Sequence, residues 1–389
     1  MIRRGPVLVV GGGVLGLSTA VELRRRGRDV TVLEPGPIPH PRAASTDISK
    51  VVRMDYGSDD FMTAFAEAAL AGWEAWNAAG PPLFHRDGFL LLTRAPMIPG
   101  GYEYESLRRM RDRGVAVARL DPLTLATRFP AWNADEYPDG YFNPTGGWAE
   151  SADVVRALAR RARRAGVGFH EGRAVALLER GGRVRGVSLE NGRTLERPVT
   201  VVAAGAWTPA LVPGLEGRME PVGQPVLHLG VEDPARWSSP AFPVWAADIA
   251  RSGWYGFPST PDGRVKVGNH GPGMRLDPES DAGVPDEHVD RCRAFLRRSL
   301  PELADAPLVG SRVCFYCDTF DGRFWIDAHP DFEALVVAAG GSGHAFKFAP
   351  LLGPVVADAV EGRATRWGRP FRWRSPGPSG PSTEDARAG

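Results

Sequence analysis

Cysteine is scarce in this chain of 389 residues, which contains only Cys292, Cys314 and Cys317. Three cysteines are too few for a disulfide framework, so the small disulfide-stabilised classes are excluded. The spacing of Cys314 and Cys317 is that of a redox dithiol or of half a zinc site, but the chain has no second pair to complete a zinc site. A buried structural cysteine is another interpretation of Cys314.

The chain also lacks an excess of charge and a long apolar run. Its 47 basic and 46 acidic residues give a formal net charge of +1, which provides no field for nucleic acid or a membrane surface. No apolar stretch reaches the roughly 18 residues needed to span a bilayer. The apolar N-terminal segment runs into a glycine turn, which indicates a strand rather than a signal peptide. We therefore expect a cytoplasmic protein without nucleic-acid or membrane partners.

A glycine motif follows the first apolar segment, residues 7–10. Gly11, Gly13 and Gly16 have the spacing of a dinucleotide-binding turn between a strand and a helix. The first two glycines allow a tight turn close to a pyrophosphate, and the third allows the helix to pack on the strand. The helix N-terminus supplies amides and a favourable dipole for the phosphates. Glu34 ends a second predicted strand and would bind the ribose hydroxyls. A glycine-rich turn in an ordinary α/β protein is the alternative.

Two later segments, 199–208 and 336–350, also run from an apolar strand into a turn. A nicotinamide-binding domain does not need the last of them. A flavoprotein in which FAD lies extended through the molecule does, because a helix N-terminus there can stabilise negative charge on the reduced ring. The dinucleotide is therefore predicted to be FAD.

Six ordered motifs resemble the FAD-dependent amine oxidases of the D-amino-acid oxidase superfamily, and within it the monomeric sarcosine oxidase, N-methyltryptophan oxidase and glycine oxidase group. The resemblance covers nearly the whole chain. It implies an α/β (α+β) fold in which a Rossmann-like FAD-binding domain is interleaved with a β-rich substrate domain. The motifs are Gly11 to Ala20, Ala203 to Thr208, Tyr255 to Ser259, Lys266 to His270, Cys314 to Tyr316, and Gly341 to Phe348.

Composition and pattern suggest how the chain divides. With 43% hydrophobic residues the chain can bury a large core in two domains. We assign residues 1–80, 151–215 and 320–370 to the FAD-binding domain, and residues 81–150 and 216–319 to the substrate domain. The tail 374–389 is too polar to bury itself and is expected to be flexible. Apolar periodicity predicts helices at 59–76, 105–113, 153–166 and 286–299, and a meander of strands at 173–195.

Flavin-dependent amine oxidation needs cations in two places. One holds an anionic substrate, and Arg53 and Lys347 match the family residues that clamp the substrate carboxylate. A guanidinium fork beside an ammonium suits a carboxylate, and Lys347 at a predicted helix N-terminus opposes the helix dipole, which suggests a bound anion. A surface ion pair is the alternative for each residue.

The second cation serves dioxygen, and Lys266 is its candidate. Lys266 lies in mid-strand, where an inward-facing lysine is costly unless it is used; on the outward face it would simply meet solvent. The matching family lysine lies at the flavin and speeds the reduction of dioxygen. Tyr255 and His270 match residues on the substrate side of the ring, although His270 could equally be a satisfied core histidine.

The resemblance further implies that Cys314 forms a thioether with a methyl group of the flavin. Thr46 and Lys50 stand where the sarcosine oxidases have a histidine and an arginine near the ring, and Asn269 replaces an aromatic residue, so the flavin environment is expected to differ. The residues expected to contact FAD are Gly11, Gly13, Val14, Leu15, Gly16, Glu34, Ser45, Thr46, Lys50, Val175, Ala204, Gly205, Trp207, Cys314, Gly341, Gly343, His344 and Lys347.

Together these features predict a monomeric oxidase of a secondary amine that carries a carboxylate, with dioxygen as acceptor and no metal. Phe242, Trp245 and Trp254 suggest a large apolar wall and hence a substrate bulkier than sarcosine. Oxidation could occur on an N-methyl or an N-carboxymethyl group, or on a cyclic imino acid such as pipecolate. The alternatives are a dehydrogenase that passes electrons to a quinone or a protein, against which Lys266 argues, and a non-catalytic FAD-binding subunit, against which the three cations argue.

Overall fold

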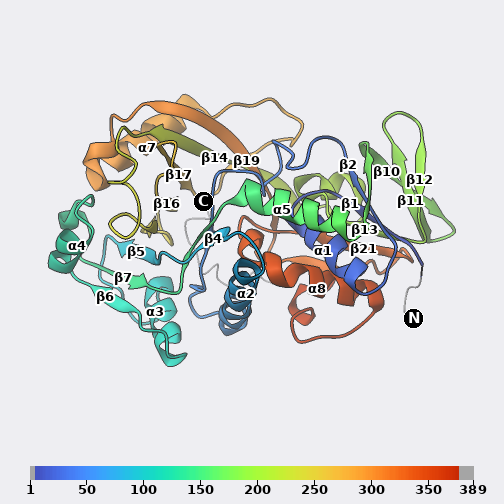
Figure 1. Ribbon diagram of the computed structural model, residues 1–389, viewed down its shortest axis with the longest axis horizontal. Helices are drawn as coiled ribbons and strands as arrows, with labels where there is room; N and C mark the ends of the chain where they lie inside the picture. The colour runs from blue at the N-terminus through green and yellow to red at the C-terminus, as the bar shows by residue number, and fades with distance from the viewer. Residues whose placement is uncertain (1–4, 376–389) are drawn as a thin grey trace.

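Two β-sheets carry the fold of residues 5–375, the part of the chain that the computed structural model describes (Figure 1). The first sheet has six strands in the order β20-β21-β13-β1-β2-β9, and all neighbours are parallel except β20 and β21. Its strands are β1 (Val7–Val10), β2 (Val30–Glu34), β9 (Gly168–Glu171), β13 (Val199–Val202), β20 (Trp325–Ala328) and β21 (Leu335–Ala339).

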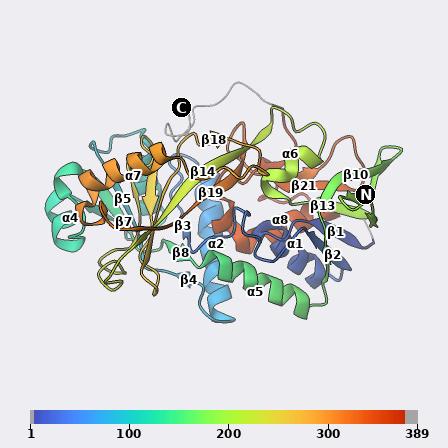
Figure 2. The same cartoon turned by 90° about the horizontal axis from the view of Figure 1, so that it is seen from above.

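Both faces of the six-stranded sheet are covered, which explains its continuous apolar strands. Helices α1 (Val14–Arg25), α5 (Ser151–Arg164) and α8 (Ala349–Glu361) lie on one side, and α6 (Thr208–Leu211) and strand β10 (Ala174–Arg180) lie on the other (Figure 2). Alternate residues of β1 therefore enter two different apolar clusters. On the face opposite α1, the sheet is covered by an antiparallel meander of β10 (Ala174–Arg180), β11 (Arg183–Leu189) and β12 (Thr194–Glu196).

The second sheet has nine strands in the order β18-β14-β17-β16-β15-β5-β7-β6, with β19 also paired to β14. The long strands β14 and β19 pair along most of their length across the middle of the molecule (Figure 1). The nine strands are β5 (Phe89–Thr93), β6 (Ala118–Leu120), β7 (Asp139–Asn143), β14 (Met219–Gly230), β15 (Val244–Ala247), β16 (Trp254–Gly256), β17 (Arg264–Asn269), β18 (Met274–Arg275) and β19 (Leu308–Thr319).

The two faces of the nine-stranded sheet differ in chemistry. One face packs an apolar cluster against α4 (Pro122–Arg128) and α7 (Asp286–Ser299). The other face carries His228, Tyr255, Lys266 and Cys314, which the strand register places on the same side. A small sheet of β3 (Lys50–Val52), β8 (Gly147–Ala149) and β4 (Phe84–His85) accompanies these layers.

The predicted helices are present, with small differences at their ends. The predictions at 59–76 and 105–113 correspond to α2 (Asp60–Ala78) and α3 (Tyr102–Asp112), and those at 153–166 and 286–299 to α5 and α7. Asp59 caps α2, since its carboxylate accepts a hydrogen bond from the Met62 amide at 2.9 Å. α3 begins earlier than predicted because the extended backbone of Gly101 caps it directly before the buried Tyr102.

The described C-terminal residues are held to the fold. Trp373 packs edge-on against Trp325, and the Arg374 guanidinium lies 2.7 Å from the Asp321 carboxylate. The rest of the predicted flexible tail, residues 376–389, lies outside the described residues. Across residues 5–375, no helix combines the length and apolar character required to cross a membrane.

Candidate active site

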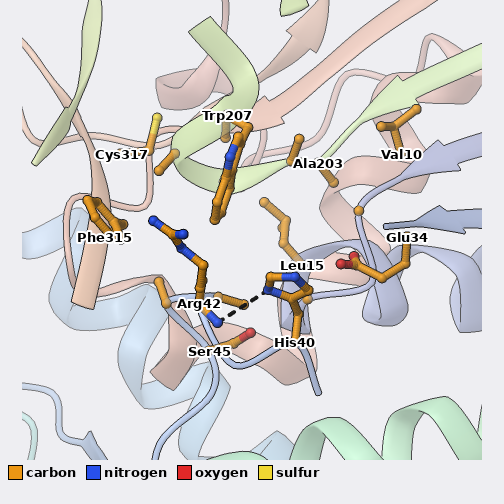
Figure 3. Close-up of a pocket in the computed structure, with 18 of the residues that line it drawn as sticks. Val10, Leu15, Glu34, His40, Arg42, Ser45, Ala203, Trp207, Phe315 and Cys317 are labelled. Atoms are coloured by element: carbon orange, nitrogen blue, oxygen red, sulfur yellow. Dashed lines mark hydrogen bonds between the residues drawn. The ribbon is translucent and has the colours of Figure 1, made fainter. Parts of the chain in front are cut away.

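A cavity of about 670 Å³ opens between the two sheets. Figure 3 shows Val10 and Glu34 at one end and Phe315 and Cys317 at the other, with Trp207 between them. The volume lies in the range of small-molecule and cofactor sites. An elongated ligand could therefore extend from the first glycine turn to the nine-stranded sheet.

The first glycine turn forms a cradle that side chains would fill. Gly11 has φ +113°, and a Cβ atom on it would lie 2.4 Å from the Ala203 carbonyl oxygen. A Cβ on Gly16 would lie 2.0 Å from the Gly11 carbonyl oxygen, which is why α1 can pack so closely on β1. The N-terminus of α1 points at the space that the turn leaves, so this end of the cavity fits a pyrophosphate.

Glu34 closes the adjacent end of the cavity. Its carboxylate accepts a hydrogen bond from the Gly12 amide. Burial raises the pKa of Glu34 to about 7, against the opposing effect of that hydrogen bond. Two ribose hydroxyls require a hydrogen-bond acceptor with spare lone pairs, so the Glu34 carboxylate fits the nucleoside part of FAD.

Replacement of Glu34 by glutamine should weaken FAD binding roughly tenfold or more, because a charge-assisted acceptor is lost. FAD titration of apoprotein in a Cys314→Ala background would measure this. A carboxyl group with a raised folded-state pKa stabilises the fold below its unfolded pKa, and that contribution is lost as pH rises through about 7. At pH 8 the apo Glu34→Gln protein should therefore melt above its parent, and equal FAD affinity of the two proteins would contradict the ribose assignment.

Most residues expected to contact FAD line the cavity. They are Gly11, Gly13, Val14, Leu15, Glu34, Ser45, Lys50, Val175, Ala204, Gly205, Trp207, Gly341 and Gly343. Gly16, Thr46, Cys314, His344 and Lys347 do not appear in its lining. Gly16 instead allows α1 to pack closely against the glycine turn. His344 Nδ1 forms a hydrogen bond with the Tyr56 hydroxyl at 3.0 Å.

Two lining arginines, Arg42 and Arg173, were not expected from the sequence. Arg42 donates hydrogen bonds to the carbonyls of Pro278, at 2.5 Å, and Ser280. Arg173 pairs with Glu279, which also accepts a hydrogen bond from the Trp207 indole. The segment 278–280 is thereby tied across the cavity. No spacing in the sequence indicates this, because the contacts join distant parts of the chain.

Arg53 and Lys347 converge on Tyr56. The Lys347 ammonium donates to the Tyr56 hydroxyl at 3.1 Å, and the Arg53 guanidinium carbon lies 5.7 Å from the centre of the same ring. Arg53 follows β3 and also donates to the Tyr102 hydroxyl at 2.9 Å, whereas Lys347 lies in the short 3₁₀ turn Ala345–Phe348 before α8. Both cations are buried, so neither forms a surface ion pair.

Lys266 lies on the inward face of β17 and is completely buried. Its ammonium is 2.7 Å from Asp47 Oδ2 and donates to the Ser49 carbonyl at 2.6 Å. Burial lowers the pKa of Lys266 to about 8, partly offset by the charge of Asp47. Lys50 and Cys314 also act on this ammonium, which places it beside the end of the cavity that Lys50 lines.

Tyr255 and His270 lie beside Tyr316. The His270 and Tyr316 ring centres are 5.9 Å apart. Tyr255 lies over Gly268, where a Cβ would come within 2.6 Å of the tyrosine ring. Burial raises the pKa of Tyr255 well above its ordinary value, so its hydroxyl remains protonated.

Cys314 and Cys317 lie on opposite faces of β19, because residues three apart on a strand point apart. The Cys314 sulfur is 3.6 Å from the Lys50 ammonium, whereas the Cys317 sulfur is 3.6 Å from the Met219 sulfur. Burial raises the pKa of Cys317 to about 12. The dithiol interpretation is therefore wrong. Within residues 5–375 no cluster of three or more His, Cys, Asp or Glu side chains could hold a metal ion.

The predicted apolar wall of Phe242, Trp245 and Trp254 is wrong. These side chains lie on the far face of the nine-stranded sheet, in the cluster beneath α7. Trp254 stacks on Phe295 of α7 with ring centres 4.8 Å apart. The residue that β15 presents beside Tyr255 is Ala246.

Lysine usage offers a signal that motif reading missed. The whole chain has three lysines, Lys50, Lys266 and Lys347, among 47 basic residues. Each of the three lies at the cavity or among the side chains just described. Every lysine of the chain therefore lies at or near this site, whereas basic residues elsewhere in the chain are arginine.

Comparison with known proteins agrees with this geometry. The family model of FAD-dependent oxidoreductases (DAO) matches residues 6–359. The chain belongs to this family. The predicted cofactor class, the enzymatic nature of the protein and the fold are thereby confirmed.

Three similar proteins show how far the likeness extends. Monomeric sarcosine oxidase of Bacillus sp. (strain B-0618) is 26% identical over 361 residues, covering 90% of each chain. L-saccharopine oxidase of Schizosaccharomyces pombe is 26% identical over 407 residues, covering 95% of this chain and 93% of the relative. The crystal structure of Amadoriase I, a fructosyl amine oxidoreductase of Aspergillus fumigatus, superposes with a TM-score of 0.83 at 26% identity, covering 96% of this chain and 90% of that one.

Proposed function

We propose that this protein is an FAD-dependent oxidase of an N-substituted amino acid, with dioxygen as acceptor. The observation that carries the proposal is the convergence of Arg53 and Lys347 on Tyr56. Two buried cations that come from distant parts of the chain and meet at one side chain form a local positive field that attracts an anion. A substrate carboxylate is an anion of the required geometry.

Each side chain at the site has a role in this proposal. Bound FAD supplies the acceptor for a hydride from the carbon next to the unprotonated amine, and the resulting imine is hydrolysed by water. Arg53 and Lys347 hold the carboxylate and so fix which carbon faces the cofactor. Tyr255 and His270 border the substrate, and Lys266 offers positive charge to dioxygen as it becomes reduced.

The names of the relatives support a secondary amine as substrate. Sarcosine, saccharopine and fructosyl amines all contain an N-substituted amine, and they differ in the size of the substituent. Ala246 beside Tyr255 is small, which favours a substituent larger than methyl. N-methyl, N-carboxymethyl and cyclic amino acids remain members of the proposed class.

A screen of N-alkyl amino acids tests the function directly. Each compound is added to the holoenzyme without oxygen while the flavin absorbance is recorded, and bleaching identifies substrates. Air is then admitted and hydrogen peroxide is measured. One peroxide per flavin reoxidised is expected of an oxidase, whereas reoxidation only by a quinone would identify a dehydrogenase. A failure of every amino acid to bleach the flavin would contradict catalysis.

We also propose that Cys314 binds the flavin covalently. The Cys314 sulfur accepts a hydrogen bond at 3.6 Å from the ammonium of Lys50, which lines the cavity, so the sulfur lies beside this end of the cavity. After acid precipitation the yellow colour of the native protein should remain in the pellet. Cys314→Ala should release all its flavin, whereas the matched control Cys317→Ala should release none. Complete release by the native protein would refute the linkage.

A further inference from the structure

A buried carboxylate joins Lys266 to a histidine that no motif indicated. Asp47 Oδ2 is 2.7 Å from the Lys266 ammonium, and Asp47 Oδ1 is 3.0 Å from His228 Nε2. Asp47 and Lys266 are completely or almost completely enclosed. Because an ionised carboxylate only accepts hydrogen bonds, His228 Nε2 carries the hydrogen and donates it.

The strand register explains why the two side chains converge. His228 on β14 is the direct partner of Lys266 on β17, so both side chains leave the same face of the sheet. On its other side His228 faces Gly310 of β19, where a Cβ would lie only 3.3 Å from His228 Nδ1. Asp47 comes from the loop before β3. The sheet thus supplies the lysine and the histidine, and a separate loop supplies their shared partner.

The surroundings contain further charged groups. Lys50 and Arg312 add positive charge near Asp47, while Cys314 and Tyr255 border the same space. The pKa of Asp47 lies well below its usual range, because attraction by Lys266 and the hydrogen bond from His228 outweigh the effect of burial. Asp47 offsets part of the unfavourable effect that burial and the charge of Lys50 have on the Lys266 ammonium. Without Asp47, the charged form of Lys266 would be less stable.

We propose that Asp47 and His228 are positioning residues that hold the Lys266 ammonium in place for the reduction of dioxygen. The proposal rests on the function proposed above for Lys266. In that step two electrons and two protons pass from the reduced cofactor and solvent to dioxygen, which leaves as hydrogen peroxide. A fixed ammonium stabilises the charge that develops on oxygen. His228 fixes the carboxylate, and the carboxylate fixes the ammonium.

The first test replaces His228. His228→Leu removes the donor, whereas His228→Gln retains an N–H that can reach Asp47. In stopped-flow experiments on the holoenzyme, His228→Leu should reoxidise roughly tenfold more slowly in air, with anaerobic reduction by substrate within twofold of the parent. His228→Gln should restore most of the loss. Equal slowing of both half-reactions, or no slowing of reoxidation, would overturn the proposal.

The second test replaces Asp47 by asparagine and does not depend on His228. Reoxidation is measured from pH 6 to pH 10. Removal of the carboxylate lowers the pKa of Lys266 further, so the loss of rate with rising pH should begin at lower pH than in the parent. An unchanged pH profile would overturn the proposal.

Measurements in the Lys266→Met background distinguish the role proposed for His228 from the role proposed for Lys266 itself. There the His228→Leu change should have no further effect on reoxidation, because the effects of coupled residues are not additive. An additive effect would overturn the proposal for His228 alone. Normal reoxidation of Lys266→Met itself would instead refute the function proposed for the lysine.

Discussion

Replacement of Lys266 by methionine should slow reoxidation of the reduced enzyme by air by orders of magnitude and leave its reduction by substrate within a few-fold of the parent. In the role proposed for Lys266, the ammonium stabilises the negative charge that develops on dioxygen, so its loss should affect the oxygen step most. Methionine preserves most of the apolar stem and removes the charge. Stopped-flow absorbance measures both half-reactions separately. Equal slowing of both would place Lys266 in substrate binding.

The pH dependence offers an internal control for this result. Burial lowers the pKa of Lys266 to about 8, so the ammonium predominates below pH 8 and is lost above it. The rate of reoxidation of the parent enzyme should therefore fall as pH rises through about 8. Lys266→Met should lack this dependence, and retention of it would assign the titration to another group.

Replacement of Arg53 by alanine should lower kcat/KM for the amino-acid substrate by roughly 30- to 1000-fold, which corresponds to about 2 to 4 kcal/mol for one partner of a charge-assisted pair. Lys347→Met should have a comparable effect. The guanidinium is buried and hydrogen-bonded to Tyr102, so solvent cannot replace it. Steady-state peroxide release measures the loss.

The matched control for Arg53 is a substrate rather than a second variant. The decarboxylated amine should be oxidised poorly by the parent enzyme, by a similar factor, and should be much less sensitive to Arg53→Ala than its parent acid. If the enzyme oxidises this amine as well as the acid, no carboxylate clamp exists. The amino-acid assignment would then be wrong.

The sequence was sufficient to predict those features of the site that depend on one local pattern of residues. The glycine turn and the position of Glu34 at the end of a strand follow from spacing, because each depends on neighbours within a single strand or turn. The domain bounds and the roles of the cations stay predictions.

Other features could be recognised only in the three-dimensional structure. Trp245 and Trp254 were assigned to the wrong face of the nine-stranded sheet, because parity along a strand does not say which face meets a ligand and a one-residue shift reverses it. Asp47 and His228 were missed because their contact depends on the pairing of β14 with β17 and on a loop from elsewhere in the chain. Arg42 and Arg173 were missed for a similar reason.

The placement of the lysines makes the site chemically addressable. Besides the terminal amine, the only primary amines that an acylating reagent can modify are those of Lys50, Lys266 and Lys347. The side chains of Lys266 and Lys347 are almost completely buried. Reagents for primary amines will therefore leave the arginine-covered exterior unlabelled. The extent of acylation, measured by mass spectrometry, therefore reports how accessible the candidate site is to solvent.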